Sequence, residues 1–400
     1  MVDLLSELVA IPAIAPEYGG DGESEKVAHL EKRLREMGFT RMERLDAPDD
    51  RVSSGNRPNL ILWLDGRSST ERLIVIVHSD VVPAGNLTLW KTDPFKTVES
   101  DGRLFGRGVE DNGQSLISSI FAAKTLLENG IKPAMDTAII VVADEEMDNA
   151  QGILHIMDQG LLKKSDMIVV PDHGIPDGRL IDTWEKAIAW IKVTTIGKPC
   201  HTSQPNKGIN AFRAAMRYGY LVDDALHKKF NLVDKIFDHP KSSFEPTKKV
   251  DNVQNINTIP GEDIFFIDCR LLPQYKIDDL MSEMRSVADS VEIETNTKIH
   301  LEYLLREDAA APMSSNAPII QKLKAAIESV YHNDPYTGGI GGSTCAGVLR
   351  RAGYHAVAWE TVEGNPHIPN EFIQIDNMMN DCKVFATLFL NQLNDIDDDI

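Results

Sequence analysis

Apolar residues in the first part of the chain follow two spacings, one typical of helices and one typical of buried strands. Residues 24–39 and 113–130 repeat apolar side chains every three or four positions, which predicts amphipathic helices. Short continuous apolar runs, typical of strands buried on both faces, occupy residues 59–66, 72–80, 137–146 and 166–174. Strands that alternate with amphipathic helices predict an α/β fold, with a mainly parallel sheet and flanking helices.

The pattern changes at Trp184. From residue 184 to residue 304, candidate strands and helices follow in the order β-α-β-β-α-β, which is the order of a ferredoxin-like α+β unit. The earlier pattern of helix and strand resumes after the Ala- and Pro-rich residues 307–318. We therefore expect one larger domain made of residues 1–183 and 305–400, interrupted by an inserted domain of residues 184–304.

Composition and charge narrow the class of protein. The chain carries 41 Lys and Arg against 61 Asp and Glu, a net charge of −20, so we expect it to bind neither nucleic acid nor an anionic membrane. Its four cysteines are widely spaced, which indicates reduced thiols rather than disulfides or a zinc finger. Residues 1–20 lack the features of a secretory signal, and no run approaches the ~18 apolar residues of a membrane span. Together these features predict a cytoplasmic protein.

Side chains that can bind metals stand where three of the predicted strands end. His78 and Asp80 follow one apolar run, Glu145 and Glu146 follow the next, and Asp172 follows the third. The carboxyl ends of strands in an open α/β sheet meet at one edge, so these side chains can lie close together. Each motif alone is more typical of a structural histidine or a solvated turn. Gathered together, the carboxylates need a cation, and the sequence therefore predicts a metal site.

Eight stretches, two of which contain strand-end residues named above, keep a fixed order between about residue 70 and residue 370. With them, the chain resembles the metal-dependent exopeptidases and deacylases of peptidase family M20, which include carboxypeptidase G, acetylornithine deacetylase, succinyl-diaminopimelate desuccinylase, peptidase T and carnosinase. The stretches are HSDVVPAG, WKTDPFKT, DGRLFGRGVEDN, ADEE, GKPCHTSQPNKGINA, NINTIPGE with DCRLLP, GGIGGS and EGNPHIPNE. They span both predicted domains, so the resemblance covers most of the chain.

The resemblance implies a site for two metal ions in the larger domain. It assigns their ligands to His78, Asp111, Glu146, Asp172 and His367. Asp111 would bridge the ions. His78 and Asp172 would complete one site, and the remaining two ligands would complete the other. Family members usually carry a cis peptide bond directly after the bridging aspartate, and we expect one here.

Glu145 would be the general base, because the resemblance leaves its carboxylate free of metal. Zinc accepts both imidazole nitrogen and carboxylate oxygen, and manganese or cobalt could occupy the same ligands. Two such ions can lower the pKa of a shared water toward ~7. Glu145 would then take a proton from this water and pass it to the leaving amine. Asp80 shares a strand face with His78 and would orient its ring.

The resemblance also implies that the inserted domain takes part in catalysis. In family members a histidine of this domain reaches the active site of the partner subunit, and His201 matches it. We therefore expect a homodimer formed through the inserted domain, with His201 stabilising the oxyanion of the reaction. The matching substrate-binding positions are Asn257, Arg270, Gly341, Gly342 and Ser343.

Three positions depart from the family pattern and bear on the substrate. Many members have Met-Lys or Asp-Lys after the bridging aspartate, where this chain has Asn112 and Gly113. Many members also have Asp in the glycine-rich loop, where this chain has Thr344. Asp172 stands where deacetylases and desuccinylases usually have Glu, and this favours a peptidase.

We therefore expect a two-zinc hydrolase that cleaves an amide bond in small peptides, next to a free carboxylate. Deacylation of N-acyl amino acids is an alternative within the same family. A metal-binding regulatory protein without catalysis is a third possibility, against which the retained pair of Glu145 and Glu146 argues.

Overall fold

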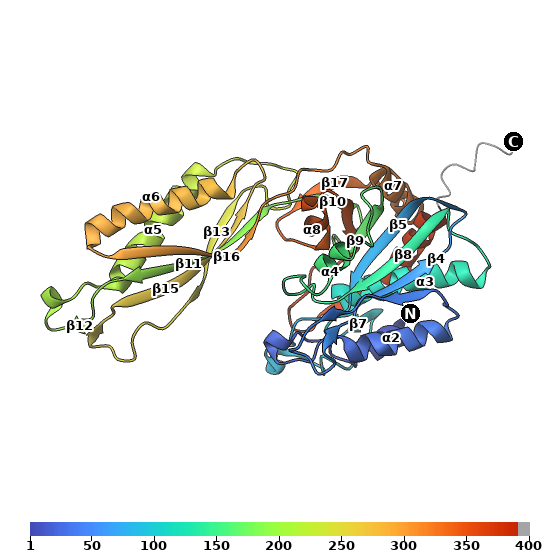
Figure 1. Ribbon diagram of the computed structural model, residues 1–400, viewed down its shortest axis with the longest axis horizontal. Coiled ribbons are helices and arrows are strands. Elements are labelled where there is room, and N and C mark those ends of the chain that lie inside the picture. The colour runs from blue at the N-terminus through green and yellow to red at the C-terminus, as the bar shows by residue number, and fades with distance from the viewer. Residues whose placement is uncertain (391–400) are drawn as a thin grey trace. The chain divides into compact units, whose positions relative to one another are not determined.

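The computed structural model describes residues 1–390, which divide into two compact units (Figure 1). The larger unit contains Met1–Thr183, Pro312–Gly338 and the described residues from Thr344 onward. The smaller unit contains Trp184–Ala311 and Gly339–Ser343. Among residues 1–390, no helix combines the length and the apolar character that a crossing of the lipid bilayer requires.

An eight-stranded mixed sheet organises the larger unit. Its spatial order is β1 (Met42–Arg44), β4 (Leu60–Leu64), β8 (Met135–Val142), β5 (Ser68–His78), β9 (Met167–Gly174), β18 (His355–Glu360), β10 (Leu180–Glu185) and β17 (Tyr336–Ile340). The central strands β8, β5, β9 and β18 are parallel, whereas β1 with β4, β4 with β8, and β10 with β18 pair antiparallel. The predicted α/β class is confirmed, with antiparallel strands added toward both edges of the parallel centre.

Both faces of this sheet are buried, which explains the continuous apolar runs in the sequence. Val75 and Val77 of β5 pack into one core, while Ile74 and Ile76 pack into the core on the other face. The first core is shared with α1 (Val2–Val9), α2 (Ser24–Glu36), α3 (Ser115–Glu128), α7 (Pro318–Tyr331) and α9 (Ile375–Leu390). The second core is shared with α4 (Ile153–Asp158) and α8 (Cys345–Arg351).

Short strands connect the main elements of the larger unit. They form a pair, β2 (Ala47–Pro48) with β3 (Asn56–Arg57), and a three-stranded sheet of β19 (Phe372–Gln374), β7 (Arg103–Phe105) and β6 (Val98–Ser100). The second of these sheets joins segments from both ends of the chain, because β19 pairs with β7.

The smaller unit has the β-α-β-β-α-β order that the sequence predicts. Its antiparallel sheet has the spatial order β13 (Ser243–Lys249), β15 (Glu262–Leu271), β11 (Ala187–Ile196) and β16 (Lys298–Glu307). The helices α5 (Ala211–Lys229) and α6 (Ile277–Thr295) share one apolar core with this sheet. A two-stranded pair, β12 (Cys200–His201) with β14 (Thr258–Ile259), extends from the unit.

Candidate metal centre

The carboxyl edge of the central sheet gathers most of the predicted metal ligands. His78 is the last residue of β5 and is paired in register with Val142, the last residue of β8. Because Glu145 and Glu146 follow β8 directly, and Asp172 lies near the end of the neighbouring β9, parallel pairing brings these side chains to one edge. Three adjacent strand ends therefore supply four of the predicted site residues.

Two more segments complete the cluster. Asp111 lies at a non-helical kink in the segment Val109–Gln114, directly before α3, and His367 lies in the loop between β18 and β19. The six side chains form two groups. Within each group, the candidate ligand atoms all lie within 4.8 Å of one another. The first group is His78, Glu145 and Asp172, and the second is Asp111, Glu146 and His367.

One carboxylate lies between the two histidines. Asp111 places Oδ1 2.8 Å from Nε2 of His78 and Oδ2 2.9 Å from Nε2 of His367. Each of its oxygens therefore faces a different group, which is the arrangement that a bridging ligand requires. The peptide bond after Asp111 is cis, as the resemblance predicts.

Each histidine faces a second carboxylate as well. Nε2 of His78 lies 3.4 Å from Oδ1 of Asp172, and Nε2 of His367 lies 3.0 Å from Oε2 of Glu146. The other ring nitrogen of His78, Nδ1, lies 3.1 Å from the backbone oxygen of Asp80 and 3.5 Å from its carboxylate. A proton on Nδ1 would be donated to Asp80, which leaves Nε2 free to bind a metal ion.

The pKa values of these groups show how much negative charge the centre concentrates. Burial raises the pKa of Glu146 to about 7 and raises the pKa of Glu145 well above its ordinary value. Hydrogen bonds to Asp111 and Glu146 raise the pKa of His367 to about 10. Burial alone would lower the pKa of His78, but its hydrogen bonds to carboxylates outweigh burial and raise the pKa. When no metal ion is bound, the positive charges that these carboxylates attract are the protons on the two histidines.

The donor set fits divalent metal ions. Imidazole nitrogen and carboxylate oxygen are ligands that zinc, manganese and cobalt accept. Oε1 of Glu146 is buried and has no hydrogen-bond partner among residues 1–390, so it is free for a ligand. Among these residues, the ion pairs of the six side chains join them only to one another and to Asp80. No lysine or arginine of the described chain takes the place of a metal ion here.

Glu371, to which the sequence assigned no role, fixes the segment that carries Asp111. Its fully buried carboxylate accepts hydrogen bonds from the backbone N–H groups of Gly108 at 3.1 Å, Glu110 at 2.9 Å and Asp111 at 3.2 Å. Nη1 of Arg107 donates a further bond at 2.6 Å. The bridging ligand is therefore positioned from a strand-connecting loop more than 250 residues away in sequence.

Glu110 in turn holds the loop that carries His367. Its buried carboxylate accepts hydrogen bonds from the backbone N–H groups of Glu363 and Asn365, the latter at 2.8 Å. The side chain of His367 is itself 53% exposed and needs such support from its loop. Both Glu110 and Glu371 stand inside motifs visible in the sequence, but no spacing rule links residues so far apart.

Asn112, one of the departures from the family pattern, ties two ligand segments together. Its side-chain oxygen accepts a bond from the backbone N–H of His78 at 3.3 Å, and its Nδ2 donates to the backbone oxygen of Pro171 at 2.5 Å. The next residue, Gly113, has no room for a side chain, because an added Cβ would lie 2.4 Å from the backbone oxygen of Gly108. Both residues therefore suit the local packing and leave the ligands in place.

In the smaller unit, His201 and Asn257 lie together. His201 is exposed on β12, and its Nδ1 lies 2.8 Å from Oγ of Ser203. The backbone N–H of Thr202 donates to the backbone oxygen of Asn257 at 3.0 Å. These two predicted residues therefore share the end of the unit formed by β12 and β14.

Arg270 and Gly341 lie at the other end of the same unit. Nη1 of Arg270 donates to the backbone oxygen of Gly341 at 3.2 Å, and Asp268 binds the rest of the guanidinium, with Nε at 2.6 Å. Arg270 pairs with Ile188 at the start of β11, whereas His201 follows the end of β11, at Ile196. Eight residues of strand, at ~3.3 Å each, separate these ends. One copy of the unit therefore does not bring His201 and Arg270 together. Gly342 and Ser343 follow Gly341 in the same segment.

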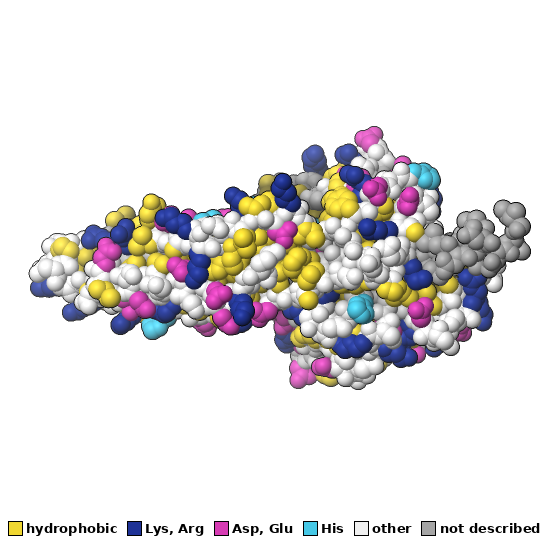
Figure 2. Space-filling model, turned by 90° about the horizontal axis from the view of Figure 1, so that it is seen from above, with side chains coloured by type: hydrophobic (Ala, Val, Ile, Leu, Met, Phe, Trp, Pro, Cys, Tyr) yellow, Lys and Arg dark blue, Asp and Glu magenta, His cyan; other side chains and the backbone are white. Residues whose placement is uncertain are grey.

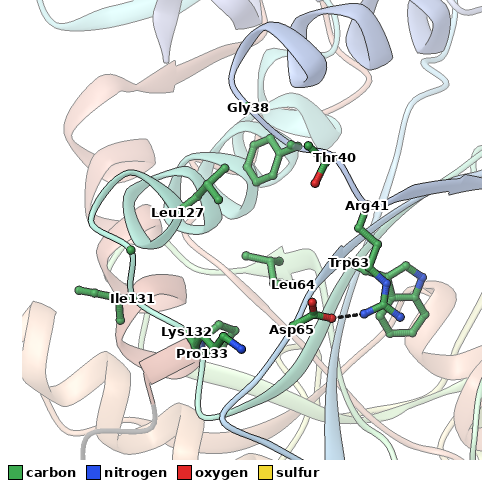
Figure 3. A pocket seen from close by; sticks show the side chains of 12 residues that line it. Gly38, Thr40, Arg41, Trp63, Leu64, Asp65, Leu127, Ile131, Lys132 and Pro133 are labelled. Carbon is green, nitrogen blue, oxygen red and sulfur yellow. Dashed lines mark hydrogen bonds and ion pairs between the residues drawn. The ribbon is translucent and has the colours of Figure 1, made fainter.

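A hollow of about 280 Å³ in the larger unit lies at the opposite edge of the central sheet (Figure 3). Its walls come from the ends of α2, β4 and α3 and include Leu64, Leu127 and Pro133, next to the residues where β5 and β8 begin. Arg41 and Asp65 form an ion pair at its rim, which neutralises both charges. It contains no group of metal-binding side chains, so the chemistry of the unit is concentrated at the other edge of the sheet.

Comparison with known proteins agrees with this geometry. The model of peptidase family M20/M25/M40 matches residues 74–391. An uncharacterized metallohydrolase of Methanocaldococcus jannaschii is 35% identical over an alignment 404 positions long, which covers 96% of this chain and 97% of the relative. A succinyl-diaminopimelate desuccinylase of Acidovorax ebreus is 24% identical over 303 residues, which cover 72% of each chain.

Solved structures share the fold at lower identity. Human carnosine dipeptidase 1 superimposes with a TM-score of 0.78 and 17% identity, and the match covers 98% of this chain and 95% of the other. Aminopeptidase PepT from Bacillus cereus superimposes with a TM-score of 0.74 and 18% identity, and the match covers 98% and 97%. Both matches include the smaller unit as well as the larger one.

Proposed function

We propose that this chain, which belongs to peptidase family M20/M25/M40 and is a hydrolase of amide bonds, cleaves small peptides at the metal centre of its larger unit. The observation that carries the proposal is the position of Asp111, whose two oxygens face two separate groups of a histidine and carboxylates. This arrangement suits a pair of metal ions that share one carboxylate. We take zinc as the native metal, with manganese or cobalt as alternatives.

The two neighbouring glutamates would then have different tasks. Two metal ions held by these residues would lower the pKa of a bound water, which would make hydroxide available near neutral pH. Glu146 faces His367 at 3.0 Å and would be a ligand, together with Asp111, His78 and Asp172. Glu145 lies in the same group as His78 and Asp172 but has no ion pair with a histidine among the described residues. As the carboxylate that the proposed ligand set leaves without a metal, it would take a proton and deliver it to the leaving amine.

A second copy of the chain is part of the proposal. His201 is exposed, and within one copy it lies far from Arg270, so a partner could use it to stabilise the oxyanion. A stripe of apolar side chains on α5 supports pairing through the smaller unit: Phe212, Met216 and Tyr220 are 36%, 55% and 73% exposed at helical spacing. Exposed apolar side chains of this unit are also visible in Figure 2. We expect this homodimer in the cytoplasm, where the four free cysteines would stay reduced.

Deacylation of N-acyl amino acids is the second candidate. It is favoured by the likeness to the desuccinylase, a relative that covers 72% of this chain. Asp172, which stands where such deacylases usually carry Glu, favours the peptidase instead.

Hydrolysis of a mixed library tests these candidates directly. Dipeptides and N-acetyl and N-succinyl amino acids would be supplied together, with zinc, manganese and cobalt in turn. We expect cleavage of dipeptides and loss of all cleavage in Glu145→Gln. Cleavage of the N-acyl compounds alone would replace the peptidase by the deacylase, and cleavage of neither class would contradict the proposed function.

A further inference from the structure

A buried cluster around Arg57 lies behind the turn that carries the two glutamates. Arg57 and Glu23 are fully buried, and the guanidinium binds both oxygens of Glu23, with Nε 2.5 Å from Oε2. Nη1 of Arg57 lies 3.4 Å from Oδ1 of Asp144 and 3.6 Å from Oδ2 of Asp49, and both of these acids are also buried. A buried ion cluster of this kind is stable only when its geometry satisfies each charge, so its members are held in fixed positions.

Asp144 connects this cluster to the chain that follows. Its backbone has φ of +62°, a left-handed conformation that asparagine and aspartate adopt more readily than most residues. Its carboxylate accepts a bond from the backbone N–H of Gln151 at 3.1 Å, and its backbone oxygen accepts one from Asn149 at 3.0 Å. Asp144 therefore turns the chain out of β8 and closes the loop in which Glu145 and Glu146 lie.

Two buried carboxylates bind three consecutive backbone N–H groups at this turn. Glu23 accepts from the N–H of Asp144 at 3.3 Å, and Asp80 accepts from the N–H groups of Glu145 at 3.2 Å and Glu146 at 3.0 Å. The side chain of Glu146, by contrast, has one oxygen without a hydrogen-bond partner among residues 1–390. The backbone of both glutamates is therefore fixed by these bonds, and the other carboxylate oxygen of Glu146, Oε2, faces His367 at 3.0 Å within the metal centre.

We propose that Asp144 is a positioning residue, which transmits the fixed geometry of the Arg57 cluster to Glu145 and Glu146 so that the second binds metal while the first stays free. This inference rests on the proposed function for the task of each glutamate. It gives a role to Asp144, which precedes Glu145 and Glu146 directly and is not among the predicted site residues. Its first consequence concerns metal binding, because a shifted turn would displace Glu146 from Asp111 and His367.

The test compares Asp144→Asn with Asp182→Asn. Asp182 is a matched control, since it is also a buried aspartate that faces a buried arginine, with Arg350 Nη2 at 3.0 Å from its Oδ2. Affinity for zinc would be measured by competition with a chelator, and thermal unfolding would report the general loss of stability. For Asp144→Asn we expect zinc to bind ~10–100-fold more weakly, as is usual for residues that support metal ligands, and kcat to fall while KM changes little. For Asp182→Asn we expect a similar loss of thermal stability with zinc affinity close to that of the unchanged protein.

Glu23→Gln is the second variant, because it keeps Arg57 while weakening the two-pronged contact that fixes it. We expect a smaller loss of zinc affinity in the same direction. Zinc affinity unchanged in Asp144→Asn, or lowered equally in the Asp182 control, would overturn the inference. Failure of both cluster variants to fold, when the control folds, would also overturn it, because the cluster would then serve the fold as a whole. Glu145→Gln run in parallel separates this result from the proposed function, since active Glu145→Gln would contradict that function without touching zinc affinity.

Discussion

Two clusters of acids lie next to each other at the end of β8, and they differ in where their positive charge comes from. In the first, Glu23, Asp49 and Asp144 surround Arg57, a fixed cation that the chain itself provides. In the second, the four carboxylates of the metal centre meet only two histidines, one of which is 53% exposed. The acid triplet of residues 144–146 is divided between them.

The difference shows how to distinguish a structural acid cluster from a site that needs an ion. Arg57 keeps its positive charge at every pH at which the protein folds, and Arg51 also pairs with Asp49, so the cations of the first cluster come from the chain itself. The histidines of the second cluster can either hold protons or bind metal, but not both at the same nitrogen. Adjacent residues in the sequence thus belong to a scaffold that carries its own fixed cation and to a centre that depends on a ligand.

Loss of the free carboxylate has the largest expected effect on turnover. Glu145→Gln removes the proposed base and leaves the charge of the Arg57 cluster unchanged, so kcat should fall by ~10²–10⁴-fold. Metal content should stay the same, because Glu145 is not a proposed ligand. Steady-state kinetics with metal analysis checks both points, and turnover close to that of the unchanged protein would exclude Glu145 as the base.

Removal of the fixed cation should cost stability instead. Arg57→Met leaves the buried carboxylates of Glu23 and Asp144 without their arginine partner, and we expect unfolding to become easier by about 3–5 kcal/mol. Arg41→Met is the control, since Arg41 is 51% exposed and its ion pair with Asp65, which is 67% exposed, should contribute at most ~1 kcal/mol. Urea unfolding of the two variants measures the difference, and equal losses would remove the distinction between scaffold and surface pairs.

A third experiment tests whether His201 of one copy of the chain acts at the metal centre of another copy. Loss of one oxyanion donor usually lowers kcat by ~10²–10³-fold, and we expect this range for His201→Ala with folding and dimerisation intact. Mixing this variant with Glu145→Gln should restore part of the activity, because mixed dimers would contain one complete site. Absence of any rescue would place the action of His201 within its own chain.

The smallest effect is expected from the loop that carries His367. Glu110→Gln weakens the acceptor that binds the N–H groups of Glu363 and Asn365, so one of two zinc ions should bind ~10-fold more weakly. Glu99→Gln, a change on the exposed strand β6, should leave zinc binding unaltered. A zinc titration recorded by calorimetry measures the affinity of each variant. Equal zinc binding in the two variants would show that the loop does not need Glu110.

The sequence predicts the parts of the site that are local and misses those that join distant segments. The ends of apolar runs indicate His78, Glu145, Glu146 and Asp172, because parallel strands place them at one edge. Asp111 and His367 lie in a turn and a loop, where no periodicity applies, and only the resemblance to a family identifies them.

No pattern along the chain predicts the contacts by which distant residues hold the site residues in place. Glu371 reaches Asp111 across 260 residues, and Arg57 reaches Asp144 across 87 residues. The sequence predicts a mainly parallel sheet but, for a related reason, does not indicate which of its strands pair antiparallel. A strand that is buried on both faces has the same apolar run in either direction, so its sequence does not indicate how it pairs.

A zinc titration of metal-free protein tests the dependence of the second cluster most directly. Chelated and dialysed protein would receive zinc stepwise, with dipeptide hydrolysis and the midpoint of thermal unfolding recorded at each step. We expect no turnover at the start, full turnover when ~two ions per chain have bound, and a rise in the unfolding midpoint over the same steps. Full hydrolysis by protein shown to contain no metal, or zinc binding that changes neither quantity, would contradict a metal centre at this edge of the sheet.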